Sequence, residues 1–434
     1  MSRFTAASKS IARRHSYGVI VLGFAIVAVA QAEPTMEPSA RSDAPLGLSE
    51  AAQLGVDHQP LLDALDAQAR AARETAVSAA QLPDPQLFGG IQDLPINTDE
   101  AYSLSRDSDT QIIVGVSQAF PRERKRRLRG EQRVREAERL DAQRVLGERA
   151  IRRDASLAWL ALWREDAAKS LALAALHESE LQEQAVRISA SAGKASQADL
   201  VMAQLNRNRQ HDDVAARAQG IEQARGVLYR WIGAAAVRPV ASDPPTLASM
   251  PNRDALLDGL RDQPELVALQ ARIDEADAGA QLADAAYAPD WRLEIGYGNR
   301  REYSDMVLVK VGMDLPLFTR NRQDRDLASS LASRDAAQAQ WQDGLRRLES
   351  DVRRACSDLE SLIGRVKYYD ETIVPQSQTA IDSALAGWRS GRGSLTQVLD
   401  ASRVRLDVEL ARLDLVRDAA QRRIQLTYFS GAQR

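Results

Sequence analysis

The chain has 434 residues, of which 44% are hydrophobic, 27% charged and only 5% aromatic, and its formal net charge is −3. This slightly acidic balance argues against nucleic-acid binding by bulk charge, and the single cysteine, Cys356, excludes an intramolecular disulfide. Few aromatics combined with many charges favour long helices with narrow apolar seams over one large compact core.

A secretory signal peptide is predicted for residues 1–32. Basic residues Arg3, Lys9, Arg13 and Arg14 precede an apolar run at 17–30, and the run ends in the A-x-A cleavage signal of residues 30–32. The run is shorter than the ~20 residues of a spanning helix, so we expect cleavage rather than a retained anchor. No cysteine stands at the junction, so lipidation is not indicated. The mature chain would lose four basic and no acidic residues and carry a net charge of −7.

Two repeats of the same pattern follow. Gln59-Pro60 recurs as Gln263-Pro264, with leucines and alanines at the same offset behind it, and Pro83-Asp84 recurs as Pro289-Asp290. Internal repetition of this kind indicates two copies of one structural unit. We assign residues 33–238 to the first repeat, 239–251 to a proline-rich linker between repeats, and 252–434 to the second repeat.

In the first repeat, periodicity predicts one helix over residues 46–82, stopped by Pro83. Strands are predicted at 86–93 and 110–120, on either side of a polar loop. A helix without proline runs from 122 to about 190, roughly 100 Å at ~1.5 Å per residue. A turn at Gly193-Lys194 leads into a returning helix over 196–231.

The second repeat predicts the same order: a helix over 252–287, strands at 290–298 and 304–316, a long helix over 322–389, a turn at 391–393 and a helix over 395–429. Pro375 should bend the long helix.

The second pair of strands alternates apolar and polar residues. The residues predicted to face lipid are Trp291, Leu293, Ile295, Tyr297, Val307, Val309, Val311 and Met313. A strand of a soluble sandwich shows the same alternation. Beyond the signal peptide no stretch approaches 18 apolar residues, so a mature chain that crosses a bilayer must do so with strands in a closed barrel. Strands with one apolar face and aromatic ends, placed between long helices, favour a shared transmembrane barrel.

The stretch 387–401, GWRSGRGSLTQVLDA, resembles the second helical tip of the TolC family of outer-membrane efflux channels, and residues 193–203 resemble the first. The resemblance implies an α+β membrane protein forming a trimeric α/β barrel, with four transmembrane β-strands per protomer and long periplasmic helical hairpins. It implies a homotrimer in the outer membrane of a Gram-negative bacterium, extending into the periplasm. Its partners would be outer-membrane lipid, a periplasmic adaptor (membrane fusion) protein and an inner-membrane RND-type pump.

Within that family, residues 82–87 (LPDPQL) and 114–121 (VGVSQAFP) are similar to the heavy-metal cation efflux branch, the CzcC- and CusC-like proteins. That branch often carries methionine near the position of 109–111, and this chain has none there. From the similarity of the two stretches we expect a passive exit duct for heavy-metal cations. The alternatives are a multidrug or type I protein secretion channel on the same fold, or, from another class, a periplasmic structural coiled-coil protein.

The resemblance also names candidate site residues. Asp400 matches the inner aspartate of the tip motif, Gln397 stands where the family has another aspartate, and Arg392 lies beside the position of the family's arginine. These are the pore gate candidates, because a ring of carboxylates would attract cations. The alternative is that Asp400 is a surface acid paired with Arg403 or Arg405. The adaptor-docking tips are Gly193, Ser196, Gly391 and Ser394.

A basic run, Arg122 to Arg129, follows the second strand. It could meet anionic lipid headgroups at the periplasmic face, or it could be a solvated first helical turn. No catalytic, cofactor or metal site is predicted, because the sequence has no phosphate-binding loop, no nucleophile elbow and no H-E-x-x-H or C-x-x-C motif.

Overall fold

The structure, a computed structural model, describes residues 44–57, 59–243 and 250–430. The predicted signal peptide and its cleavage site lie outside these residues. Within them, no helix is long and apolar enough to cross a membrane.

The first repeat contains helices α1 (Leu48–Leu54) and α2 (Pro60–Ala79), strands β1 (Gln86–Gln92) and β2 (Gln111–Phe120), and the long helices α3 (Glu123–Ser191) and α4 (Gln197–Ile232). A short 3-10 helix, η1 (Gly233–Val237), follows. The second repeat contains α5 (Arg253–Asp258), η2 (Gly259–Asp262), α6 (Pro264–Ala285), β3 (Trp291–Asn299), β4 (Met306–Met313) and η3 (Thr319–Asn321). It continues with α7 (Gln323–Tyr368), η4 (Tyr369–Ile373), α8 (Val374–Arg389) and α9 (Leu395–Ser430).

Each repeat opens with two helical pieces, where the sequence predicted one continuous helix. Gln59 and Gln263 have extended backbones and precede the prolines that begin α2 and α6. Proline disfavours the helical conformation in the residue before it, so each helix breaks there. The predictions of single helices over 46–82 and 252–287 were therefore wrong at these glutamines.

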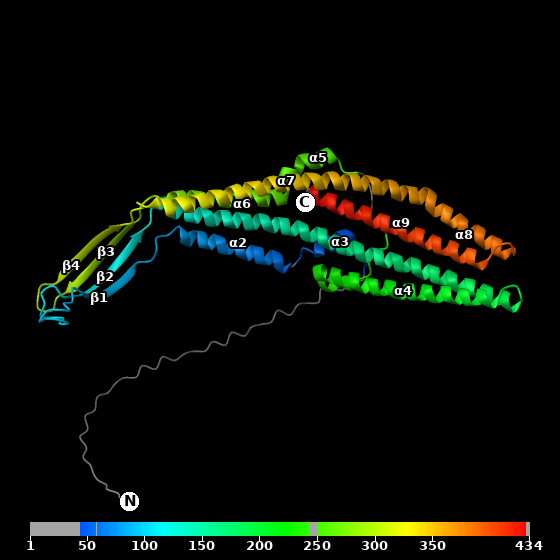
Figure 1. The fold of residues 1–434 in the computed structure, drawn as a ribbon, viewed down its shortest axis with the longest axis horizontal. Helices are drawn as coiled ribbons and strands as arrows, with labels where there is room; N and C mark the ends of the chain where they lie inside the picture. The colour runs from blue at the N-terminus through cyan, green and yellow to red at the C-terminus, as the bar shows by residue number, and fades with distance from the viewer. Residues whose placement is uncertain (1–43, 58, 244–249, 431–434) are drawn as a thin grey trace, which may run out of the picture. The chain divides into compact units, whose positions relative to one another are not determined.

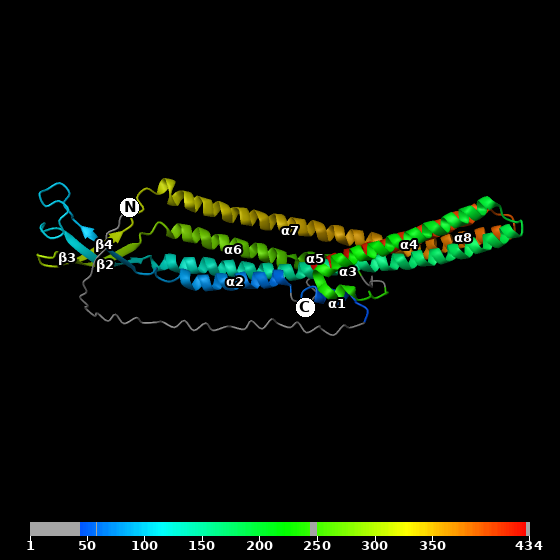
Figure 2. The ribbon, with the colours of Figure 1, turned by 90° about the horizontal axis from the view of Figure 1, so that it is seen from below.

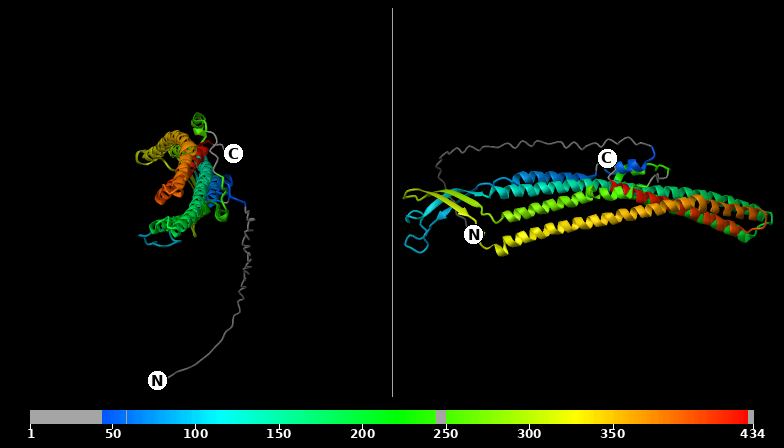
Figure 3. Two further views of the ribbon diagram at one scale, coloured as in Figure 1. Left: turned by 90° about the vertical axis from the view of Figure 1, so that its right-hand side faces the viewer. Right: turned by 90° about the horizontal axis from the view of Figure 1, so that it is seen from above.

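The helices form one layer. Near the sheet the order across the layer is α2, α3, α6, α7 (Figures 1 and 2), and towards the helical turns it is α4, α3, α9, α8 (Figure 1). The strands lie at one end of this layer and both helical turns at the other. Figure 3 shows α7 running alongside α6, and α3 alongside α2. The two lateral edges of the layer are formed by α2 with α4 and by α7 with α8, and within the described residues no other long helix lies outside them.

The long helix of the second repeat changes winding at η4, a π-helical turn over Tyr369–Ile373 directly before Pro375. Proline has no N–H and collides with the carbonyl four residues earlier, so widening one turn relieves the conflict. The bend predicted at Pro375 appears as the change of direction between α7 and α8 (Figure 1).

The four strands form one antiparallel sheet in the order β1-β2-β3-β4. Strand β4 is shorter than the predicted 304–316, because Asp305 accepts hydrogen bonds from the Tyr297 hydroxyl and, at 2.8 Å, from Asn299 Nδ2, which ties it into the turn. Strand β1 ends at Gln92 because Asp93 has φ 57°, a conformation that interrupts a strand.

The main core lies midway along the helical layer. Trp159 and Leu228 are fully buried there, with Leu46 of the N-terminal segment. The backbone carbonyl of Leu46 accepts a hydrogen bond from Trp159 Nε1 at 2.8 Å, and Leu46 pairs with Val240 in a short parallel bridge. The described part of the predicted linker is therefore packed against the start of the first repeat.

Candidate channel surfaces: the sheet, the helical tips and the joint between them

One face of the sheet is apolar and open. Register places Leu293 beside Val311, Ile295 beside Val309 and Tyr297 beside Val307. Val307 is 74% exposed and Val309 62%. The residues predicted to face lipid lie on this face, together with Leu87, Ile91, Ile112, Val114, Val116 and Phe120 of the first repeat, all exposed. Trp291 and Phe120 mark the end nearer the helices and Tyr297 the end nearer the loops.

The opposite face of the sheet carries charged residues and glycines, and the side chains of Phe88 and Ile113 lie close to two of these glycines. A Cβ at Gly115 would lie 2.5 Å from the ring of Phe88, and one at Gly296 would lie 3.3 Å from Ile113. Glycine is therefore needed where these two side chains cross the sheet. Glu294 stands directly opposite Lys310 on this face.

Both tips turn with the same geometry. Gly193 has φ 74° and Gly391 φ 73°, the left-handed conformation that favours glycine at a helix end. Lys194 N donates to Ser189 O at 2.8 Å, and Arg392 N donates to Gly387 O at 3.0 Å. These bonds satisfy carbonyls that the last helical turn leaves open.

Both returning helices begin with a capping box. Asp199 N donates to Ser196 Oγ at 3.1 Å, and Ser196 N donates to the Asp199 carboxylate at 2.9 Å. In the second tip Gln397 N donates to Ser394 Oγ at 3.3 Å, and Ser394 N donates to Gln397 Oε1 at 3.1 Å. Each box satisfies two donors at the helix start. The bonds from Ser196 lower the pKa of Asp199 below its ordinary value.

The gate candidates differ in their surroundings. Gln397 is held by its capping bonds. Asp400 is exposed and forms no ion pair among the described residues, where Arg403 pairs with Asp407 and Arg405 with Glu178. The expected alternative pairing of Asp400 with Arg403 or Arg405 was therefore wrong.

Asp400 is exposed and points away from α3. Ser402 and Arg405 of α9 contact Gln182 and Glu178 of α3, at 3.1 and 3.0 Å. Residues of a helix turn by ~100° each, which puts Asp400 on the other side of α9. Arg392 is also exposed, and its side chain forms no ion pair within the part of the chain that the structure describes.

The two tips pack on each other through an apolar cluster that the sequence did not predict. Val186 of α3, Ala203 of α4 and Leu395 of α9 are buried, with Trp388 of α8 against them. Helical periodicity in the sequence places each of these residues on an apolar helix face. It does not indicate that the faces of the two hairpins contact each other.

Part of the basic run forms a joint between the repeats. The prediction of a solvated helical turn is wrong for Lys125, which is buried, whereas Arg122 and Arg124 are exposed. Lys125 is buried and pairs with Asp290 at 3.0 Å. The same carboxylate accepts from Arg122 N at 3.1 Å, and Arg122 Nε donates to Pro289 O at 3.0 Å. Arg124 pairs with Asp284 at 3.1 Å. This joint links the first turn of α3 to the chain entering β3.

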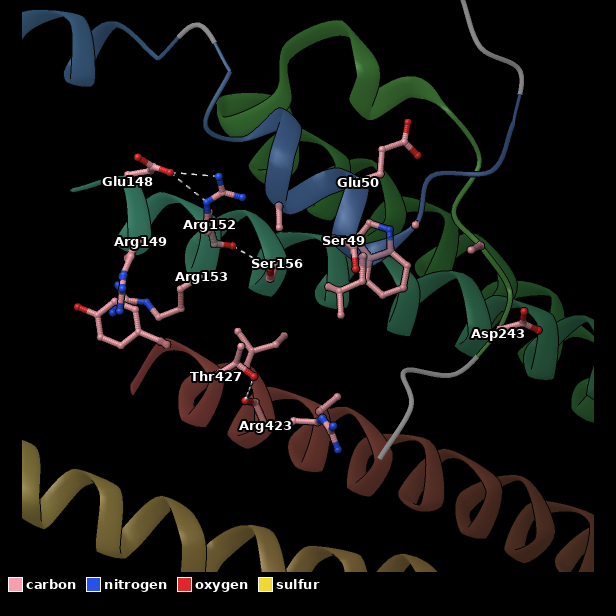
Figure 4. Close-up of a pocket in the computed structure, with 18 of the residues that line it drawn as sticks. Ser49, Glu50, Glu148, Arg149, Arg152, Arg153, Ser156, Asp243, Arg423 and Thr427 are labelled. Carbon is pink, nitrogen blue, oxygen red and sulfur yellow. Dashed lines mark hydrogen bonds and ion pairs between the residues drawn. The ribbon is translucent and has the colours of Figure 1, made fainter. Parts of the chain in front are cut away.

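A cavity of about 780 Å³ lies between α1, α3 and α9 (Figure 4). Its wall carries arginines of α3 and α9 and the ring of Tyr428, with Arg153 stacked at 4.9 Å from that ring. Burial raises the pKa of Tyr428. Arg152 is bound by Glu148 and Gln53, so the wall mixes both charges. Within the described residues no three His, Cys, Asp or Glu side chains gather in a way that could hold a metal ion.

Comparison with known proteins places these surfaces. Residues 258–432 match the family described as "Outer membrane efflux protein". The chain is 24% identical over 230 residues to the cobalt-zinc-cadmium resistance protein CzcC of Cupriavidus metallidurans, covering 52% of this chain and 54% of that protein. It is 26% identical over 153 residues to the pyoverdine export outer membrane protein OpmQ of Pseudomonas putida, covering 32% of this chain and 31% of that protein. The matched part therefore spans about half the length of the first relative and a third of the second.

Two solved structures share the fold. The outer membrane protein VceC of Vibrio cholerae superposes with a TM-score of 0.72 at 19% identity, covering 88% of this chain and 96% of VceC. CusC superposes with a TM-score of 0.69 at 16% identity, covering 88% and 91%.

The fold of the chain is therefore that of VceC and CusC. Over residues 258–432 the chain is similar to the outer membrane efflux protein family, and along most of its length it has the fold of the TolC-like efflux channels. It is accordingly an outer-membrane protein of a Gram-negative bacterium that extends into the periplasm.

Proposed function

We propose that three copies of this chain assemble into a passive exit duct for heavy-metal cations. The observation that carries the assembly is the sheet: its apolar face is exposed, and the outer edges of β1 and β4 are unpaired within the described residues. Unpaired edge strands and exposed apolar faces are both costly. Closing the sheet with neighbouring copies removes the edges, and lipid covers the apolar face.

The helices support the same closure. The lateral edges of the helical layer end at α2 with α4 and at α7 with α8, on the same two sides as β1 and β4 respectively (Figure 1). A symmetric ring of copies would close the sheet into a barrel and the helices into a tunnel. The tips at the far end would meet a periplasmic adaptor and, through it, an inner-membrane pump. The channel itself would couple to no energy source.

The proposal of metal cargo rests on the likeness to CzcC, whose name describes cobalt, zinc and cadmium resistance. Exposed Asp400 supports it, because copies of one carboxylate at a constriction favour cations. A second cargo is favoured by a different observation, the likeness to OpmQ, whose name describes pyoverdine export. An organic molecule would need no carboxylate ring.

The test is a deletion strain complemented with the wild-type gene. Growth is measured across cobalt, zinc, cadmium, copper and silver salts, and in parallel across dyes, detergents and antibiotics. We expect metal sensitivity that the wild-type gene corrects, with the organic panel unchanged. Sensitivity confined to organic compounds would favour the second cargo. A parallel extraction of the membrane fraction tests the class, because a periplasmic coiled-coil protein would need no detergent.

A further inference from the structure

The two residues that correspond by repeat to Lys125 and Asp290 lie at opposite lateral edges of the layer, so they cannot pair within one chain. Asp290 follows Pro289 and enters β3, and Asp84 follows Pro83 and enters β1. Asp290 is partly buried by its partners, whereas Asp84 is exposed and has no partner among the described residues. The first repeat therefore holds a carboxylate with nothing to bind.

The second repeat holds the matching basic group. Arg122 caps α3 and Lys125 is the third residue of that helix, while Arg322 caps α7 and Arg325 is the third residue of α7. Arg325 is exposed and has no side-chain partner among the described residues. The backbone N–H of Arg122 donates to Asp290, but that of Arg322 already donates to Thr319 O at 2.9 Å. The Arg325 side chain is therefore the group of the second repeat that can bind a carboxylate.

Relative to the short helix of its own repeat, the start of α7 lies where the start of α3 does, although a longer connection leads from the strand to α7. Tyr287, just after α6, donates its hydroxyl to Asp324 at 2.7 Å. In the first repeat Arg126 Nη1 donates to Ala80 O, just after α2, at 3.3 Å. Each long helix thus begins beside the end of the short helix of its own repeat.

The sheet register brings the two halves together between copies. Leu87 pairs with Val116 and Leu293 with Val311, which aligns the two hairpins residue by residue. Between the hairpins, Gln118 pairs with Leu293. Carried to the open edges, this register sets Met313 of one copy opposite Leu87 of the next, with both on the apolar face. The chain preceding β1 then enters beside the start of α7, as the chain preceding β3 enters beside the start of α3.

We propose that Asp84 of one copy pairs with Arg325 of its neighbour, repeating the Lys125–Asp290 joint across the subunit boundary. This inference rests on the proposed trimer. The occupant of the site is a second copy of this chain, because charge complementarity and the joint already present within the chain both define it. The ring of copies would then carry one type of joint at every boundary between hairpins, alternately within and between chains.

The test is cross-linking of paired cysteines in a Cys356→Ala background. An ion pair of long side chains holds its Cα atoms farther apart than a disulfide spans, so a short bis-methanethiosulfonate reagent is used. We expect Asp84→Cys with Arg325→Cys to give covalent trimers that a reducing agent dissolves. The matched control, Lys125→Cys with Asp290→Cys, should react but remain monomeric after denaturation.

Charge reversal gives a second measurement. Asp84→Arg alone and Arg325→Asp alone should each reduce the heat-sensitive trimer band on an unheated gel, and the double reversal should restore it. Arg127→Asp, an exposed change at the start of α3 with no partner among the described residues, should leave the band unchanged. A wild-type chain that forms no trimer would overturn the proposed function. A normal trimer in which Arg325→Cys does not cross-link, or in which Arg322→Cys does instead, would overturn the joint alone.

Discussion

Some residues at the tips form the capping bonds of the turns, whereas others form no such bond and are exposed. Gln397 and Asp199 occupy the same capping position in the two repeats, and both are engaged with the serine three residues before. Asp400 lies one helical turn further on and is exposed. The tip helices therefore differ in charge where they begin, although they begin in the same way.

The cap of α4 should depend on pH and the cap of α9 should not. Because its bonds lower the pKa of Asp199 from 3.8, the carboxylate stabilises the helix start fully above that value and loses this contribution as pH falls through the lowered pKa. Gln397 does not titrate. Hydrogen exchange, corrected for intrinsic rates, should show the first turn of α4 losing protection below about pH 4 while α9 keeps it. Equal loss in both would contradict the assignment.

Removing either cap should cost a similar amount at neutral pH. Ser196→Ala and Ser394→Ala should each destabilise the start of their helix by about 1 kcal/mol, because each serine oxygen accepts from the third residue of its helix. Local protection of the first turn is the measurement. Thr396→Ala, on an exposed side chain beside the second cap, is the control and should change little.

Asp400→Asn should reduce cation selectivity and weaken block by multivalent cations, with little effect on folding. The reason is that repeated carboxylates at a constriction attract cations, and this one is not used by any ion pair among the described residues. Asp199→Asn should matter less for conduction. Planar-bilayer recordings of both variants decide between them: normal conduction in Asp400→Asn with altered conduction in Asp199→Asn would mean that the inner and outer helices are interchanged.

At the scale of elements, the sheet is the part whose two faces have different tasks. Its apolar face is continuous across all four strands, whereas its polar face carries Glu294 opposite Lys310 and glycines that receive Phe88 and Ile113. A slip of one residue in any strand would exchange these faces. The register is therefore a functional property of the sheet.

Val309→Arg and Leu293→Arg should block membrane assembly, while Glu294→Gln should not. An arginine on the lipid face at mid-depth costs roughly 2–4 kcal/mol. Glu294 lies on the other face, and the glutamine that replaces it has nearly the same size. The readout is the heat-sensitive trimer in outer-membrane extracts. Equal tolerance of all three variants would show that the assignment of faces is wrong.

At the scale of the whole molecule, the described residues form one layer with two open sides. The core midway along the layer holds Trp159 of the first repeat together with Leu413 of the second, and the tips join through Val186 and Leu395. Both repeats are thus fixed to each other at the middle and at one end, and the joint at Asp290 fixes them near the sheet. A layer held at three places can close with its neighbours as a rigid unit.

The mature protein should begin at Glu33 without a lipid anchor. The motive is the cleavage signal at residues 30–32 behind the apolar run, with no cysteine at the junction. Mass spectrometry of the purified N-terminus is the measurement. An intact Met1 or an acylated first residue would contradict this.

The sequence by itself determined the repeat, the order of helices and strands, and the alternating faces of β3 and β4, because these depend on local spacing of apolar residues, prolines and glycines. It also marked the tip turns, where left-handed glycines precede capping serines. It missed the breaks at Gln59 and Gln263, since periodicity continues through them while the following proline ends the helix.

Only the tertiary structure decided what the charged residues do. Lys125 belongs to a basic run in the sequence, but its partner Asp290 stands in the other repeat, and no local pattern connects them. Arg405 is near Asp400 in the chain and yet pairs with Glu178 of α3. The physical reason is that an ion pair depends on which surfaces pack together, and that is set by the burial of apolar faces from both repeats at once.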